Sequence, residues 1–283
     1  MKPTLKYSEM YITNVCNYSC THCQSFNNYA FKGHQRWDDY KDEYELLSKK
    51  LDIGIIQLMG GEPTLNPDFN KWLKGISNLW PTAKLQISTN GSTLNKLTQD
   101  VYAVLSKNNG TLWITCHDIK LYDGFLDFIN TFLDVIVSDT GEAPARRVSR
   151  IFIDKNGVEV ILDWSQTFRA SAMDLVNKQL TLGYDSDVDE AHDVCGFKTC
   201  HQMNKGKLYK CPLVSVLPDF LNQFNVAVAD KELAHAYQPM SHDDDVEKFV
   251  NNLVNPIPQC KFCPSNYNTG HDFIGTDKKI KLV

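Results

Sequence analysis

The sequence of 283 residues lacks any long apolar stretch, since no run approaches the roughly 18 residues that a membrane span requires. Its first residues also lack the apolar core of an export signal. We therefore expect a cytoplasmic protein without a membrane partner. Basic clusters are missing as well, and the net charge is −5. Because nucleic-acid binding usually depends on neutralising phosphates, we expect no nucleic-acid partner.

Cysteine, by contrast, is abundant, with nine residues in a chain without an export signal. Metal ligation explains such a set better than a disulfide framework does. Cys16, Cys20 and Cys23 form a C-x3-C-x2-C run on one short segment. Three such thiolates can hold three irons of a [4Fe-4S] cluster and leave the fourth iron open, although this spacing is also compatible with zinc.

A second motif follows at the end of an apolar run over residues 53–59, which is typical of a buried parallel strand. It reads Gly60-Gly61-Glu62-Pro63, and by itself it is compatible with an ordinary tight turn. The cysteine run and this strand end together resemble the radical SAM superfamily. The resemblance implies that the open iron binds S-adenosylmethionine and that Gly60, Gly61 and Glu62 are cofactor-binding residues.

Strand and helix patterns alternate through the first half of the chain. This alternation predicts an α/β fold with a parallel sheet, and the resemblance implies a partial (β/α)6 barrel. Ligands of such sheets collect at the carboxyl ends of the strands. The predicted strands cover residues 8–13, 53–59, 85–89, 112–115 and 135–137, and the predicted helices have apolar faces within residues 40–47, 66–76, 94–105 and 125–132.

Further candidate site residues lie at these strand ends or beside the cysteines. By resemblance, His22 packs against the adenine, and Ser88 and Asn90 contact the methionine carboxylate and the ribose. A surface position for His22 and turn chemistry for Asn90 are the alternatives. His117, at the end of the fourth strand, is the candidate catalytic residue, and a satisfied core histidine is equally compatible with that position. We interpret Cys116 as a small buried hydrophobe.

The pattern changes in the second half of the chain. Residues 148–153 and 158–162 predict a β-hairpin in place of a crossover helix. Residues 168–180 have a helical pattern, and the acidic stretch 185–193 has the composition of an exposed loop. Three arginines near the hairpin are compatible with either an anionic substrate or a solvated face: Arg146, Arg147 and Arg150.

We divide the chain into a core barrel of residues 1–184 and a smaller domain of residues 185–283, built from a β-hairpin and helices. In the second domain, Lys205-Gly206 predict a hairpin turn that places Cys200 opposite Cys211. This domain resembles the twitch domain, a shortened form of the SPASM extension, which binds an auxiliary [4Fe-4S] cluster. A zinc site is the alternative. The preferred ligands are Cys195, Cys211, Cys260 and Cys263, with Cys200 as an alternative ligand.

The resemblance implies reductive cleavage of S-adenosylmethionine to a 5′-deoxyadenosyl radical, which abstracts hydrogen from a substrate. It also implies an electron donor such as flavodoxin or ferredoxin. Only a few residues precede the first strand, which disfavours peptide maturation, so we expect a small-molecule substrate, with sugars or natural products as the favoured class. The alternatives are a peptide-modifying maturase and a non-catalytic iron-sulfur or zinc-binding protein.

Overall fold

The structure of the protein is a computed structural model. It describes residues 2–20, 22–133, 135–139, 147–165, 167–169, 173–176, 179–182, 184–226, 228, 230–266 and 269–272. Predicted features outside these ranges, among them Arg146, lie outside the described residues.

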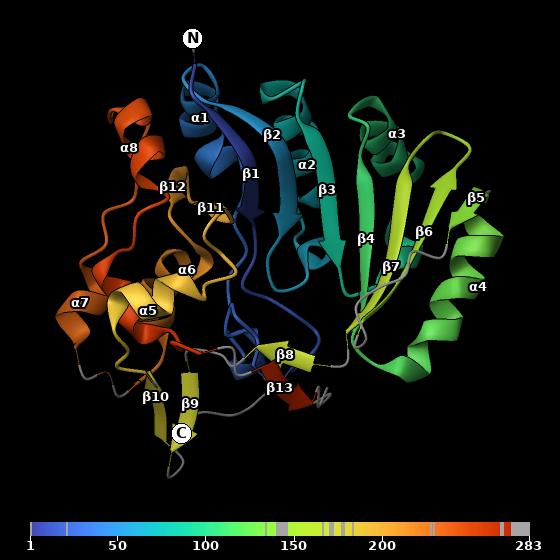
Figure 1. Cartoon of the computed structure of the whole chain (residues 1–283). Helices are drawn as coiled ribbons and strands as arrows, with labels where there is room; N and C mark the ends of the chain where they lie inside the picture. The colour runs from blue at the N-terminus through green and yellow to red at the C-terminus, as the bar shows by residue number, and fades with distance from the viewer. Residues whose placement is uncertain are drawn as a thin grey trace.

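A nine-stranded sheet forms the centre of the molecule, in the order β12-β11-β1-β2-β3-β4-β7-β6-β5 (Figure 1). Six neighbouring strands run parallel to one another. They are β11 (His201–Asn204), β1 (Thr4–Tyr11), β2 (Asp52–Met59), β3 (Lys84–Thr89), β4 (Thr111–Cys116) and β7 (Glu159–Ser165). The antiparallel strands at the two edges are β12 (Lys207–Tyr209), β6 (Arg147–Asp154) and β5 (Val135–Asp139).

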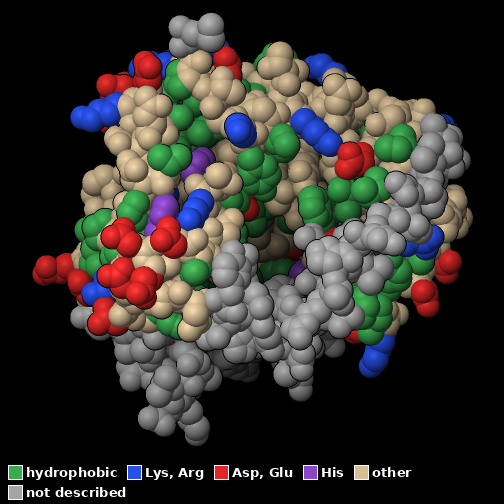
Figure 2. Space-filling view, viewed as in Figure 1, with side chains coloured by type: hydrophobic (Ala, Val, Ile, Leu, Met, Phe, Trp, Pro, Cys, Tyr) green, Lys and Arg blue, Asp and Glu red, His purple; other side chains and the backbone are tan. Residues whose placement is uncertain are grey.

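One face of this sheet is covered by helices that follow the strands. Figure 1 shows α1 to α3 behind the sheet, and apolar residues at alternate strand positions pack against them in one large core. Alternate positions on the opposite face are left for a cavity, and Figure 2 shows a hollow in front of the strands. The helices are α1 (Trp37–Ser48), α2 (Phe69–Leu79), α3 (Gln99–Lys107) and α4 (Tyr122–Phe132).

A second, smaller core joins the cysteine loop to the C-terminal part of the chain. Phe26, Tyr29 and Phe31 from the loop surround Phe220, with ring centroids 4.9, 5.8 and 5.4 Å away. Phe220 belongs to α6 (Pro212–Gln223), so this helix packs against the loop. The remaining helices here are α5 (Val188–Asp193), α7 (Lys231–His235) and α8 (Val246–Asn252).

Short elements complete the described part of the chain. Two small antiparallel pairs, β8 (Thr167–Arg169) with β13 (Thr269–Asp272) and β9 (Met173–Val176) with β10 (Gln179–Leu182), lie outside the main sheet. Among the described residues, no helix is both long and apolar enough to span a membrane. The 3-10 helices are η1 (Asn27–Tyr29), η2 (Pro63–Leu65), η3 (Leu94–Lys96), η4 (Ile119–Leu121) and η5 (Pro258–Phe262).

The predicted α/β fold with a partial parallel barrel is confirmed, and so are the first four strands and the hairpin of β6 and β7. The hairpin turn at Lys205 and Gly206 is confirmed too, because both residues have positive φ angles, 49° and 77°, as a two-residue turn of this kind requires. The division at residue 184 stays a prediction, although β11 extends the same sheet beside β1.

The strand at 135–137 is confirmed as part of β5, and two other element predictions were wrong. β5 lies at the edge of the sheet, antiparallel to β6, because the β6–β7 hairpin supplies the strand that pairs with β4. The helix at 168–180 is replaced by short strands, since backbone pairing between β9 and β10 outweighs the local pattern. Part of the acidic stretch 185–193 is the helix α5, which begins where the Asp187 side chain accepts from two backbone N–H groups.

Candidate active site

Cys16, Cys20 and Cys23 lie on the loop that follows β1, at the carboxyl end of the parallel strands. None of the nine cysteines, all within the described part of the chain, is in a disulfide. The Cys16 Sγ accepts from the Tyr18 backbone N–H at 3.4 Å and from the Asn90 amide Nδ2 at 3.7 Å. Cys23 donates to Asn27 at 3.6 Å. The loop thus presents three thiols within a network of polar donors.

The Gly60–Gly61 segment fixes the position of this loop. The Gly61 N–H donates to the Thr13 carbonyl at 2.8 Å, and the Glu62 N–H donates to the Val15 carbonyl at 2.8 Å. A Cβ atom on Gly60 would lie 2.5 Å from the Thr13 carbonyl oxygen, and one on Gly61 would lie 2.3 Å from the Val15 carbonyl oxygen. The glycines therefore permit close approach of two backbone segments, in addition to lining the cavity beside the cysteines.

Glu62 connects the ends of β2 and β3. Its buried carboxylate accepts from the Thr89 hydroxyl at 2.8 Å, from the Asn90 backbone N–H at 2.7 Å and from the Thr64 backbone N–H at 3.2 Å. Burial raises the pKa of Glu62, while these donors lower it. Thr64 and Thr93 form a further hydroxyl contact beside it. Since protein donors surround the carboxylate, its role here is to hold the two strand ends together.

Asn90 and His117 close the site from the next two strands. The Asn90 amide donates to the Asn17 side chain at 2.9 Å, which links the end of β3 to the cysteine loop. His117 follows β4, and its ring meets Tyr18 edge to face, with centroids 6.2 Å apart. Burial lowers the pKa of His117 to about 4, although Asp163 raises it, so the imidazole is neutral near pH 7.

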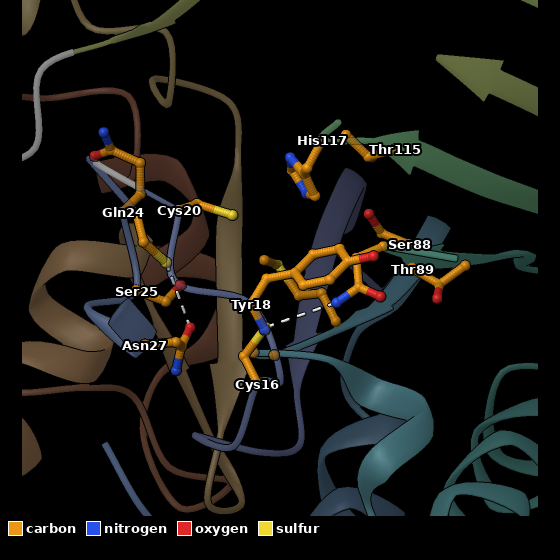
Figure 3. Close-up of a pocket in the computed structure, with 15 residues that line it drawn as sticks. Cys16, Tyr18, Cys20, Gln24, Ser25, Asn27, Ser88, Thr89, Thr115 and His117 are labelled. Atoms are coloured by element: carbon orange, nitrogen blue, oxygen red, sulfur yellow. Dashed lines mark hydrogen bonds between the residues drawn. The ribbon is translucent and has the colours of Figure 1, made fainter. Parts of the chain in front are cut away.

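These elements enclose a cavity of about 220 Å³. Figure 3 shows His117 and Thr115 at the end of β4 on one side, Cys20 and Gln24 on the other, and Tyr18 between them. Of the predicted site residues, His22 and Glu62 are not among the described residues that line it. The lining residues are Cys16, Tyr18, Cys20, Cys23, Gln24, Ser25, Asn27, Met59, Gly60, Gly61, Ser88, Thr89, Asn90, Thr115 and His117.

His22 has a left-handed backbone conformation, with φ 62°, and its carbonyl accepts from the Gln24 side chain at 3.5 Å. Its predicted contact with adenine stays a prediction. Cys116 is 1% exposed, and its thiol donates to the Asp118 carbonyl at 3.0 Å. That position in the large core agrees with the interpretation of Cys116 as a buried hydrophobe. Arg150 pairs with Leu162, a residue of the same core, on the helix-covered face.

A row of polar residues that the sequence analysis missed crosses the cavity face of the sheet. Gln202, Glu9, Gln57 and Gln86 occupy neighbouring register positions on β11, β1, β2 and β3. They share a face with Met59, which lines the cavity two residues beyond Gln57. The signal was present in the sequence for two of these strands, because Gln57 interrupts the apolar run over residues 53–59 and Gln86 lies between Leu85 and Ile87.

Glu9 differs from Gln57 and Gln86 in its contacts. Glu9 accepts from Gln202 at 2.8 Å and from the Cys200 thiol at 3.1 Å, and burial raises its pKa to about 7. The side chains of Gln57 and Gln86, in contrast, have no hydrogen-bond partner in the described part of the chain. Two amides on the cavity face are thus available to a ligand.

The second group of cysteines lines a separate cavity of about 30 Å³. Cys195 follows α5, Cys211 is the N-cap of α6, and Cys260 and Cys263 lie in and after η5. Cys200 is not among the described residues that line this cavity. The described residues contain no group of three His, Cys, Asp or Glu side chains arranged to hold a single metal ion. Burial raises the pKa of Cys211 to about 12.

A known family model is similar to the part of the chain that holds the first site. The Radical SAM superfamily model matches residues 10–117. Among curated relatives, the GTP 3',8-cyclase of Nautilia profundicola is 30% identical over 94 residues, which are 32% of this chain and 30% of the relative. That of Aliarcobacter butzleri is 23% identical over 143 residues, 50% of this chain and 38% of the relative. The chain spans about a third of the length of these relatives.

Two solved structures are among those similar to this chain. BtrN in complex with AdoMet and 2-DOIA has a TM-score of 0.45 and 16% identity, covering 99% of this chain and 98% of its own. Streptococcus suis SuiB bound to S-adenosylmethionine has a TM-score of 0.33 and 20% identity, covering 44% of this chain and 27% of its own. The segment that matches the Radical SAM superfamily model, residues 10–117, holds the cysteine loop, the Gly60–Gly61 strand end and His117.

Proposed function

We propose that the protein is a radical SAM enzyme that acts on a small polar molecule. The observation that carries this proposal is the single cavity of about 220 Å³ lined by Cys16, Cys20, Cys23, Gly60 and Gly61. The radical SAM family implies a [4Fe-4S] cluster and S-adenosylmethionine. When bound, this pair supplies a 5′-deoxyadenosyl radical that abstracts hydrogen, which is chemistry of the cofactor.

The three loop cysteines fit the cluster. They are partly exposed, they line one cavity, and Cys16 already accepts from Tyr18 and Asn90. Donors directed at sulfur favour its thiolate form and help to set the potential of a cluster. Gly60 and Gly61 hold the loop against the end of β2, while the packing of Phe26 on Phe220 holds it from the other side.

The polar residues at the strand ends fit S-adenosylmethionine. Ser88 and Asn90 line the cavity next to the cysteines, with hydroxyl and amide groups suited to carboxylate and ribose oxygens. His117 faces the same cavity and is neutral near pH 7, so its imidazole can donate or accept one hydrogen bond to a bound molecule. We propose His117 as the residue that orients the substrate.

The polar row supports a substrate rich in neutral hydrogen-bonding groups, such as hydroxyls or amides. Gln57 and Gln86 have no hydrogen-bond partner in the described part of the chain, and amides pair well with such groups. Glu9 contributes a carboxyl group to the same row. A small polyhydroxylated molecule therefore suits this face.

The second cavity supports an auxiliary [4Fe-4S] cluster on Cys195, Cys211, Cys260 and Cys263. All four thiols line it, and Cys211 lies at the N-terminus of α6, where backbone N–H groups favour a thiolate. These residues come from three separate elements, so a shared cluster would tie the C-terminal part together. We also propose an external one-electron donor such as flavodoxin or ferredoxin, and a cytoplasmic location.

Anaerobic reconstitution tests the proposed function. The reduced wild-type protein should convert S-adenosylmethionine to 5′-deoxyadenosine, measured by liquid chromatography and mass spectrometry. The variant with Cys16, Cys20 and Cys23 replaced by alanine should form none while keeping the iron of the second site. Cysteine-to-alanine replacement of Cys116, which is buried in the core, is the matched control and should leave cleavage intact. Undiminished cleavage in the triple variant contradicts the proposal.

A further inference from the structure

The cavity of the second cysteine group contains two nitrogen-bearing side chains in addition to the four thiols. Lys210 and His192 both line it, together with Cys195, Cys211, Cys260 and Cys263. Lys210 precedes Cys211 directly, and His192 lies in the last turn of α5, three residues before Cys195. Two separate parts of the chain therefore place a lysine and a histidine around one small cavity that the four cysteines also line.

Lys210 is a buried cation, with 4% of its surface exposed. Its Nζ donates to the Leu253 carbonyl, and its backbone N–H donates to the Tyr237 hydroxyl at 2.9 Å. A buried ammonium is costly unless negative charge lies close by. Burial lowers the pKa of Lys210, and negative charge on Cys211, Cys260 and Cys195, which line the same cavity, raises it.

His192 has an unpaired nitrogen in the same space. The residue is 8% exposed, and its Nε2 atom is buried without a hydrogen-bond partner in the described part of the chain. Nearly all buried polar side-chain atoms in folded proteins have a partner, and each exception calls for an explanation. An anionic group with sulfur acceptors, held by the adjacent cysteines, would supply that partner.

We propose that Lys210 and His192 are positioning residues that raise the reduction potential of the second cluster, Lys210 through its charge and His192 through an N–H donated to sulfur. The inference rests on the auxiliary cluster of the proposed function. Reduction adds negative charge to a cluster that already bears four thiolates, so a nearby buried cation favours the reduced state. A hydrogen bond to sulfur acts in the same direction.

Lys198 provides a matched control. It lines the same cavity, but its side chain is 38% exposed and forms an ion pair with Asp193 at 3.5 Å. Water screens a charge in that position. Comparison of Lys198 with Lys210 therefore separates the effect of a buried charge from the general effect of removing a lysine.

The experiment is a redox titration followed by electron paramagnetic resonance. It uses the full chain with Cys16, Cys20 and Cys23 replaced by alanine, so that the signal comes from the second cluster alone. Lys210→Gln keeps a donor for Leu253 and should lower the equilibrium constant of one-electron reduction about tenfold, a shift of about 59 mV to lower potential. His192→Leu should lower it by about threefold, and Lys198→Gln by less than twofold.

Each outcome supports or overturns the proposed roles of Lys210 and His192. Equilibrium constants of reduction within twofold of the parent in both Lys210→Gln and His192→Leu, at full iron and sulfide content, overturn the inference. If Lys210→Gln does not hold iron, His192→Leu alone decides. Loss of iron in both, with iron retained in Lys198→Gln, assigns the two residues to cluster assembly and also overturns it. A parent without iron and sulfide refutes the auxiliary cluster itself, which is a different failure.

Discussion

The Cys200 thiol donates a hydrogen bond to the Glu9 carboxylate, with Sγ 3.1 Å from Oε1. This contact joins the start of β11 to the middle of β1, where Glu9 also accepts from Gln202. The sequence predicts Cys200 opposite Cys211 across the hairpin, and extending the β11–β12 register by two residues agrees with that. The Cys200 side chain nevertheless meets the polar row, and burial next to Glu9 raises its pKa above the ordinary value.

The first prediction concerns the fourth ligand of the auxiliary cluster. Cys200→Ser should keep the iron and sulfide of the second site, because a serine hydroxyl can replace the donor to Glu9. Cys195→Ser should lose more than half of that iron, since Cys195 lines the cavity. Both variants are analysed for iron and sulfide with Cys16, Cys20 and Cys23 replaced by alanine. The reverse result would make Cys200 the ligand.

The second prediction concerns Gly61. The sequence resemblance favours glycine here because the main chain approaches S-adenosylmethionine, which predicts that a larger residue loses cofactor before iron. The contact of a Gly61 Cβ with Val15, 2.3 Å from its carbonyl oxygen, and with Cys16 predicts that Gly61→Ala displaces the cysteine loop. We expect the variant to lose iron and cleavage together and to be destabilised by about 2–4 kcal/mol.

Gly124→Ala is the matched control for that variant. Gly124 lies inside α4, where a Cβ would meet nothing within 4 Å, so alanine should keep both iron and cleavage and stabilise the helix by about 1 kcal/mol. Iron content, 5′-deoxyadenosine and urea unfolding are the measurements. A Gly61→Ala protein with full iron and weak S-adenosylmethionine binding would instead support the explanation from the sequence, in which the main chain at Gly61 approaches S-adenosylmethionine.

The sequence was sufficient for the parts of the site that lie on local motifs. The cysteine run, the Gly60–Gly61 turn and the strand ends at Asn90 and His117 are recognisable because each follows a strand of a parallel sheet. The alignment of residues on neighbouring strands could not be predicted from these motifs. Whether Glu9 aligns with Gln57 or with a neighbour depends on strand register, and register follows from packing of the whole core.

The same limit explains the elements that were predicted wrongly. Residues 168–180 carry apolar side chains at helical spacing, yet the chain pairs β9 with β10, and such pairing is not visible in a short sequence window. The strand predicted at 135–137 is present as β5, but the alternation of strands and helices did not predict its antiparallel position. Its place at the edge of the sheet follows from its antiparallel pairing with β6.

The third prediction concerns pH. Burial lowers the pKa of His117 to about 4, below the value near 6.5 of an unfolded histidine. The unfolded chain therefore binds the proton more tightly, and the stabilisation is complete above pH 6.5 and lost as the pH falls toward 4. Because the side chain is only partly buried, we expect about 1–2 kcal/mol between pH 7 and pH 5.

Urea unfolding of wild type and His117→Gln at pH 7 and pH 5 measures this effect. The wild-type free energy of unfolding should fall more between the two pH values than that of the variant, by about 1–2 kcal/mol. Equal pH dependence in the two proteins would mean that His117 is not held neutral by its surroundings, and the orienting role proposed for its neutral imidazole would then fail.

The last prediction separates binding residues from structural ones among the buried glutamines. Gln86 is 7% exposed and has no hydrogen-bond partner in the described part of the chain, whereas Gln35 donates to the Tyr11 carbonyl and to Asn204, each at 2.6 Å. Gln86→Leu should leave the free energy of unfolding unchanged or raise it by up to about 1 kcal/mol, because no internal hydrogen bond is lost. Gln35→Leu should lower it by about 2–3 kcal/mol, since its acceptors and donors are left unpaired.

Substrate binding should be affected more by Gln86→Leu than the free energy of unfolding is. Gln86→Leu should form 5′-deoxyadenosine from S-adenosylmethionine as the wild type does in the absence of substrate, because Gln86 is not among the described residues that line the cavity beside the cysteines. With substrate, its KM should rise about tenfold, the effect of one lost hydrogen bond of about 1.4 kcal/mol. A Gln86→Leu protein that is destabilised as strongly as Gln35→Leu would show that this amide serves the fold, and the polar row would then lose its assignment as a substrate surface.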